Sequence, residues 1–272
     1  MEMIDLSRLE PQETLSHTSK GNQLKWKCYG YWYKADHIGY EGRTETIVSA
    51  LLGKSTVKYP FVAYEYSQIK YKDRVYSGCK SADFLADGYD LIPLEKLYRK
   101  FTGGSLAVDT AHQGEITDQI KFLVNFVEQT TGLQEFGRYL TSMLEIDAFF
   151  LNEDRHTNNI AVQYNAADNT YALCPLFDNG LSLLADTNMD FPLERSLEDC
   201  LKTVEAKPFS RYFDEQLDAA EELYGIQLHF NFSTNDVKAL IDSYRTAYSQ
   251  EICDRCEALI RRQMRHYGYL VK

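Results

Sequence analysis

The chain has few cysteines, no long apolar run and little positive charge. Its six cysteines are scattered over 272 residues, which argues against a disulfide scaffold and favours reduced thiols. No segment approaches the roughly 18 consecutive apolar residues of a membrane span. The first residues are acidic and polar, where a signal peptide is basic and then apolar. The sequence therefore predicts a cytoplasmic protein with no membrane partner.

The charge balance is acidic. Lys and Arg number 29 against 40 Asp and Glu, a formal net charge of -11. Because nucleic acids and anionic membranes reward clustered Lys and Arg, this balance argues against direct nucleic-acid binding. Hydrophobic residues make up 44% of the chain and aromatic residues 13%, enough to bury the core of one large domain or of two lobes.

Patterning divides the chain into a strand-rich part and a helical part. Extended segments are expected at 24–33, 59–66 and 74–79, with one helix from an N-cap at Thr44 to Leu52. Helices are expected at 115–131, 133–150, 197–204, 212–224, 234–249 and 250–267, and strands at 160–164 and 170–176. The predicted fold class is α+β with two lobes, a small antiparallel-sheet N-lobe over 1–83 and a mainly helical C-lobe over 84–272.

The segment around the predicted hairpin carries the chemistry. Asn159 follows Asp154 by five positions, and the hairpin returns the chain to Asp178, two residues before Gly180. In phosphoryl transfer one carboxylate orients the acceptor hydroxyl, while a carboxylate and an amide oxygen hold the magnesium that bridges the nucleotide phosphates. Asp154 fits the first role, and Asn159 and Asp178 fit the second. A structural alternative is an ion pair between Asp154 and Arg155, with an ordinary turn at Asp178.

Asp154-Arg-His-x-x-Asn159, followed by Phe-Asp178-Asn-Gly180, resembles the HipA-like serine/threonine kinases. Phosphoinositide kinases share the Asp-Arg-His order, so the motif leaves the acceptor open. The resemblance implies a two-lobed protein-kinase-like fold, ATP and Mg²⁺ as cofactors, and the short form of the family without the additional N-terminal domain of longer members.

Lys34 and Glu45 are candidates for the nucleotide side of the site. In kinases a strand lysine contacts the phosphates and is held by a glutamate on the following helix. Lys34 ends an expected strand and Glu45 lies in the first turn of the expected helix. The alternative is a surface lysine and a glutamate that interacts with the helix dipole.

A loop over 16–22 has the residue types of a phosphate-covering loop. Gly21 permits close backbone approach, and Ser19 and Lys20 offer donors to phosphate oxygens. The resemblance implies that this loop covers the nucleotide, with Ser16 and Ser19 as candidates for autophosphorylation. A plain surface loop fits these residues equally well.

The resemblance also places the inter-lobe hinge after the strand at 74–79. Cys79, Lys80 and Ser81 are the candidates for offering backbone groups to the adenine. His156 is a candidate phosphate contact, Arg155 a candidate anchor for its loop, and both also fit structural roles. The segment 206–213 resembles one that recurs in HipA-like sequences, but no chemistry follows from its residue types.

Three functions fit the sequence. The first is an ATP- and magnesium-dependent serine/threonine protein kinase acting on a protein substrate, for which the resemblance allows an antitoxin-like or regulatory partner. The second is a kinase of a lipid head group or other small molecule on the same fold. The segment 182–198 disfavours anionic membranes, since Arg195 is its only base among Asp186, Asp190, Glu194 and Glu198. The third is a catalytically idle nucleotide-binding module.

Overall fold

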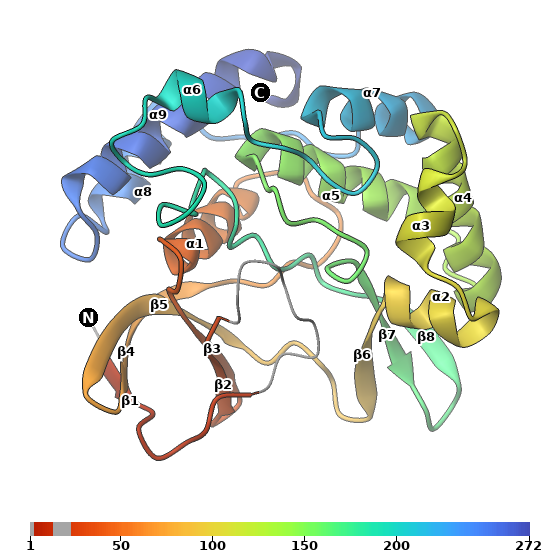
Figure 1. Cartoon of the computed structure of the whole chain (residues 1–272), viewed down its shortest axis with the longest axis horizontal. Coiled ribbons are helices and arrows are strands. Elements are labelled where there is room, and N and C mark those ends of the chain that lie inside the picture. The colour runs from red at the N-terminus through yellow and green to blue at the C-terminus, as the bar shows by residue number, and fades with distance from the viewer. Residues whose placement is uncertain (1–2, 13–22) are drawn as a thin grey trace.

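The computed structural model describes residues 3–12 and 23–272, which form two lobes (Figure 1). The N-lobe holds a five-stranded sheet in the order β1-β4-β5-β3-β2. Its strands are β1 (Met3–Asp5), β2 (Lys25–Cys28), β3 (Tyr31–Ala35), β4 (Glu65–Tyr71) and β5 (Arg74–Ala82). β1 runs parallel to β4, and the other pairings are antiparallel. The helix α1 (Glu41–Leu52) connects β3 to β4.

The C-lobe is mainly helical and holds an antiparallel sheet in the order β6-β7-β8. These strands are β6 (Tyr89–Pro93), β7 (Ala161–Asn165) and β8 (Thr170–Leu173). The helices are α2 (Leu94–Thr102), α3 (Leu106–Ala111), α4 (Ile116–Thr131), α5 (Phe136–Phe150), α6 (Leu197–Leu201), α7 (Phe213–Tyr224), α8 (Thr234–Asp242), α9 (Gln250–His266) and the 3-10 turn η1 (Gly268–Leu270). The predicted α+β fold of two lobes is confirmed. Within residues 3–12 and 23–272, no helix is long and apolar enough to cross a membrane.

A single hydrophobic core joins α1 to the C-lobe. Ile47, Val48 and Leu51 of α1 are at most 1% exposed, and they belong to the same apolar cluster as the buried residues of α5 and α9. Each such side chain contributes about 1.5–3 kcal/mol when fully buried. Figure 1 shows α1 between the N-lobe sheet and the helices of the C-lobe. This packing gives residues on α1 a defined position relative to the C-lobe.

The start of α1 differs from the prediction. The helix begins at Glu41 with Tyr40 at its N-cap, so an N-cap at Thr44 is wrong. The Thr44 hydroxyl instead lies 2.8 Å from the carbonyl oxygen of Glu41 and 2.6 Å from that of Gly180. A contact with a residue 136 positions away holds Thr44 inside the first turn, and local sequence gives no sign of it.

The strand predicted at 59–66 is also misplaced, because β4 begins only at Glu65. The segment before β4 pairs instead with the chain that follows β8. The N–H of Val62 donates to the Leu176 carbonyl at 2.9 Å, and the N–H of Leu176 donates to the Pro60 carbonyl at 2.8 Å. Phe61 packs against the main core. The apolar pattern that suggests a strand therefore reflects contact with the C-lobe.

Candidate active site

Lys34, Glu45 and Asp178 meet at the junction of the lobes. Lys34 comes from β3, Glu45 from α1, and Asp178 from the loop after β8. The Lys34 ammonium lies 2.5 Å from Glu45 Oε1 and 3.0 Å from Asp178 Oδ1, and it donates to the Tyr64 hydroxyl at 3.3 Å. The two predicted halves of the site, the Lys34–Glu45 pair and the Asp178 loop, are thus in direct contact.

The electrostatics of Lys34 and Asp178 favour the charged form of both side chains. Burial disfavours the Lys34 ammonium, but the carboxylates of Asp178 and Glu45 outweigh it and hold the pKa of Lys34 well above its usual value. Burial likewise opposes the Asp178 carboxylate, yet the positive charges of Lys34 and Lys25 hold the pKa of Asp178 well below its usual value. Asp178 is therefore an ionised carboxylate at neutral pH, the form that a metal ligand needs.

Asp154 and Asn159 face each other across one tight loop. α5 ends at Phe150, and its C-cap Leu151, with a φ of 57°, turns the chain out of the helix. The Asn159 amide nitrogen then donates to the Asp154 carbonyl at 2.8 Å and to Asp154 Oδ2 at 3.0 Å. Because Nδ2 is engaged in this way, the amide oxygen Oδ1 of Asn159 is the atom left for a metal.

Arg155 anchors the loop that contains Asp154 and Asn159 through hydrogen bonds to buried groups. Its guanidinium forms two hydrogen bonds with the Asp147 carboxylate, at 2.8 and 3.0 Å, and both side chains are at most 2% exposed. It also donates to the Asn159 carbonyl at 3.1 Å, to the Phe177 carbonyl at 2.9 Å and to Asn179 Oδ1 at 3.2 Å. Arg155 therefore joins the Asp154 loop to the Asp178 loop. Its carboxylate partner is Asp147 on α5, so the alternative of an Asp154–Arg155 pair at a helix end is wrong.

The Asp178 loop is held against α1. The backbone N–H of Asn179 donates to Glu45 Oε2 at 3.0 Å, and the Thr44 hydroxyl contacts the Gly180 carbonyl. A Cβ added at Gly180 would lie 3.4 Å from the Glu41 Cβ. That distance is an ordinary van der Waals contact, so packing against α1 does not by itself require glycine at position 180.

His156 and Lys207 both lie near the Oδ1 atom of Asp154. His156 Nε2 is 3.7 Å from Asp154 Oδ1, and the buried His156 Nδ1 has no hydrogen-bond partner in the described parts of the chain. The Lys207 ammonium is also 3.7 Å from Asp154 Oδ1. Sequence reasoning assigned no chemistry to Lys207, because it lies 53 positions from Asp154 and carries no motif of its own.

The predicted hinge residues lie inside the N-lobe sheet. Cys79 and Lys80 are flanked by β3 on one side and β4 on the other, and Cys79 is fully buried. Ser81 lies opposite Trp32 of β3. Backbone groups in a paired strand are satisfied by its neighbours, so those of Cys79 and Lys80 are not free to contact an adenine.

The alternation of hydrogen bonds along β5 indicates where free backbone groups begin. The Ser77 carbonyl accepts from the Asp36 N–H, and the Asp83 N–H donates to the Gly30 carbonyl. Along this segment the backbone N–H and C=O groups of odd-numbered residues therefore point toward the β3 side. In an antiparallel pair the bonding direction alternates, so Ala82 directs its N–H and C=O to the opposite side. β4 pairs with β5 only as far as Lys80, which leaves Ala82 facing the open edge.

The predicted phosphate-covering loop lies outside the described residues. This applies to Ser16, Ser19, Lys20 and Gly21, and with them to the autophosphorylation candidates.

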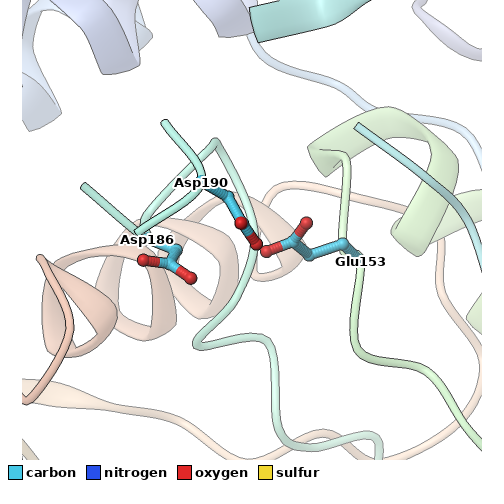
Figure 2. A group of neighbouring side chains, drawn as sticks. All are labelled: Glu153, Asp186 and Asp190. Atoms are coloured by element: carbon cyan, nitrogen blue, oxygen red, sulfur yellow. The ribbon is translucent and has the colours of Figure 1, made fainter. Parts of the chain in front are cut away.

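Three carboxylates form a cluster that the sequence did not reveal. Oxygen atoms of Glu153, Asp186 and Asp190 lie within 4.8 Å of one another, and Figure 2 shows Glu153 and Asp190 pointing toward each other beside Asp186. Asp186 is fully buried, and its Oδ1 accepts the N–H of Met189 at 3.0 Å. The segment 182–198 is therefore not simply an exposed acidic loop, since part of its negative charge turns inward beside the Asp154 loop.

Comparisons with known proteins identify the fold. No family model matches the chain, and no curated protein matches it. Among solved structures, the chain is similar to the proinflammatory kinase CtkA of Helicobacter pylori, with a TM-score of 0.64 and 15% sequence identity. The similarity covers 97% of this chain and 95% of that one. The chain therefore has a kinase-like two-lobed fold over nearly its whole length.

Proposed function

We propose that the chain is an ATP- and magnesium-dependent kinase that phosphorylates serine or threonine hydroxyls of proteins. The observation that supports this most directly is the meeting of Lys34, Glu45 and Asp178 at 2.5 and 3.0 Å. A lysine paired with a helix glutamate and placed against a metal-binding aspartate is the arrangement that protein kinases need for activity. The kinase-like fold supports the same reading, although a fold alone does not define an activity.

The residues fit ATP and Mg²⁺ by their chemistry. Asp178 supplies an ionised carboxylate and Asn159 an amide oxygen, both hard oxygen ligands of the kind that Mg²⁺ prefers. Bound Mg²⁺ would bridge and neutralise the nucleotide phosphates. Lys34, held by Glu45, is placed to contact those phosphates. Asp154, oriented by Asn159, would accept the proton of the acceptor hydroxyl.

The adenine is assigned to the end of β5. Ala82 offers the first N–H and C=O beyond the pairing with β4, and these groups match the hydrogen-bonding edge of a purine. Phe84 and Phe177 stand close by, with ring centroids 5.5 Å apart and planes inclined by 32°. An apolar platform next to free backbone groups is a suitable site for a flat base.

The choice of a protein acceptor is supported by the charge of the chain. A net charge of -11 and the carboxylates of Glu153, Asp186 and Asp190 beside the Asp154 loop disfavour an anionic lipid surface.

The test is transfer of labelled γ-phosphate from ATP in the presence of Mg²⁺. Wild type, Asp154→Asn and Asp178→Asn are compared, with Asp168→Asn at the exposed tip of the β7–β8 hairpin as the matched control. We expect label on protein serine or threonine with wild type and control, and a loss of at least about 1,000-fold in the two site variants. Absence of transfer by wild type contradicts a kinase. Label confined to lipids or small molecules contradicts the protein acceptor.

A further inference from the structure

Lys207 places a positive charge against the carboxylate proposed as the base. Its ammonium is 3.7 Å from Asp154 Oδ1, while Asp154 Oδ2 accepts from Asn159 at 3.0 Å. The two oxygens of Asp154 thus have different surroundings. Oδ2 is held within its own loop, and Oδ1 faces Lys207 and His156.

The backbone that carries Lys207 is held firmly, although the side chain is 43% exposed. The fully buried Gln216 of α7 donates to the Lys207 carbonyl at 3.1 Å and accepts from the Phe209 N–H at 3.3 Å. The N–H of Ala206 donates to the Arg211 carbonyl at 2.9 Å. A fixed backbone with a solvent-accessible ammonium lets the side chain move between two partners without a rearrangement of the lobe.

The two buried positively charged side chains of the site already form ion pairs with other carboxylates. Lys34 is paired with Glu45 and Asp178 on the nucleotide side, and Arg155 is bound by Asp147 beneath the loop. Lys207 instead lines a surface pocket of about 300 Å³ that includes Glu153, the chain neighbour of Asp154. An acceptor bound in this pocket would lie beside Lys207.

We infer that Lys207 is a catalytic residue that contacts the phosphoryl group during transfer, an inference that rests on the proposed kinase function. In the reaction the acceptor oxygen forms a bond to the γ-phosphorus, and its proton passes to Asp154 Oδ1. The bond from the γ-phosphorus to the bridging oxygen breaks, and its electron pair leaves with ADP. Negative charge on the transferred group attracts the Lys207 ammonium, which keeps its proton and turns from Asp154 to a phosphoryl oxygen.

The experiment replaces Lys207 in the full chain by Ala, Met and Arg. Met keeps most of the apolar stem without the charge, and Arg keeps the charge. We expect Lys207→Ala and Lys207→Met to lower kcat for phosphate transfer about 100-fold at nearly constant KM for ATP, the size seen when one stabilising donor is removed. Lys207→Arg should stay within about tenfold of wild type.

Lys202→Ala is the matched control. Lys202 is 71% exposed and pairs with Asp199 on α6, so its loss changes the net charge equally without touching the site. A single-turnover assay and a thermal unfolding curve accompany each variant.

Full activity of Lys207→Met overturns the inference. An equal loss of activity in Lys207→Arg and Lys207→Met also overturns it, because both outcomes exclude a role for the positive charge. Inactive wild type overturns the proposed function, and the inference with it, whereas active wild type with active Lys207→Ala overturns the inference alone.

Discussion

Arg155 and Asp147 form a buried, doubly hydrogen-bonded ion pair directly behind the Asp154 loop. Loss of the guanidinium would leave the fully buried Asp147 carboxylate without its main partner. It would also remove the hydrogen bonds that join the Asp154 loop to the Phe177 carbonyl and to the Asn179 side chain.

We therefore expect Arg155→Met to lower the free energy of unfolding by about 3–5 kcal/mol, the cost of breaking a buried ion pair from one side. Urea unfolding measures this change. Arg138→Met on α5, the helix that carries Asp147, is the control, since Arg138 is 58% exposed and pairs with Glu135 at the surface. Its effect should remain within about 0.5 kcal/mol. If Arg155→Met has the same free energy of unfolding as Arg138→Met, the Arg155–Asp147 pair contributes little to stability.

The titration of Asp36 should lower the free energy of unfolding as pH rises. It lies between Lys34 and α1, accepts from the Gly42 N–H at 2.6 Å and from the Tyr248 hydroxyl at 2.9 Å. Burial, with the neighbouring Glu41 charge, raises its pKa to about 7 from 3.8. Between these values the folded chain binds more protons than the unfolded chain, so the stabilisation present below about pH 4 is lost as pH rises toward 7.

Asp36→Asn removes this titration while its amide can still accept from Gly42. We expect the variant to gain roughly 2 kcal/mol relative to wild type between pH 5 and pH 8, measured by urea unfolding at each pH. Burial raises the pKa of Glu145 to about 8 in the same sense, so some slope remains in both proteins. Parallel pH profiles for the two proteins would contradict a raised pKa at Asp36.

Gly39 allows α1 to approach the segment that follows Asp178. A Cβ at this position would lie 1.7 Å from the Ala185 carbonyl oxygen, a backbone atom that cannot move by a side-chain rotation. We expect Gly39→Ala to destabilise the fold by about 3 kcal/mol, the upper end of the usual cost of overpacking with backbone displacement. Gly268→Ala, where nothing lies within 4 Å of the added Cβ, should change stability by less than about 0.5 kcal/mol. Similar melting temperatures for the two variants would contradict this account.

Local patterns in the sequence were sufficient for the fold class and for the pairing of Lys34 with Glu45, which the structure contains. The catalytic roles of Asp154, Asn159 and Asp178 stay a prediction. Contacts between distant segments were not readable in the same way. Asp147 is one of several polar residues in α5, and its partnership with Arg155 depends on how the chain turns at Leu151. Thr44 and Lys207 likewise take their roles from residues 136 and 53 positions away.

The end of β5 and the start of β4 were predicted wrongly for a related reason. Residue types in β5 do not reveal where the pairing with β4 stops, and that end point decides which backbone groups are free. The apolar residues before Glu65 form an extended segment, but they pack on the C-lobe and bond to Leu176. Strand propensity indicates that a segment fits a pleated, partly buried surface, but it does not determine which other segment it pairs with.

Asn159 offers the sharpest test of the loop geometry, because its amide donates to Asp154. In Asn159→Asp the donor is replaced by a second carboxylate about 3 Å from the first, the original Nδ2–Oδ2 distance being 3.0 Å. Two like charges at this separation raise the pKa of the pair, since one shared proton relieves the repulsion. The folded variant then binds more protons than the unfolded chain, so its stability deficit relative to wild type should shrink as pH falls from 8 toward 5.

We expect a loss of about 2 kcal/mol at pH 8, measured by urea unfolding. Asn165→Asp is the control: Asn165 Oδ1 accepts the Ala167 N–H at 2.9 Å in an exposed turn, and a carboxylate oxygen accepts that bond equally well. The control should follow the wild-type pH profile. If Asn159→Asp follows it too, the Asn159 amide does not donate to Asp154 in solution, and the orientation assigned to both side chains is wrong.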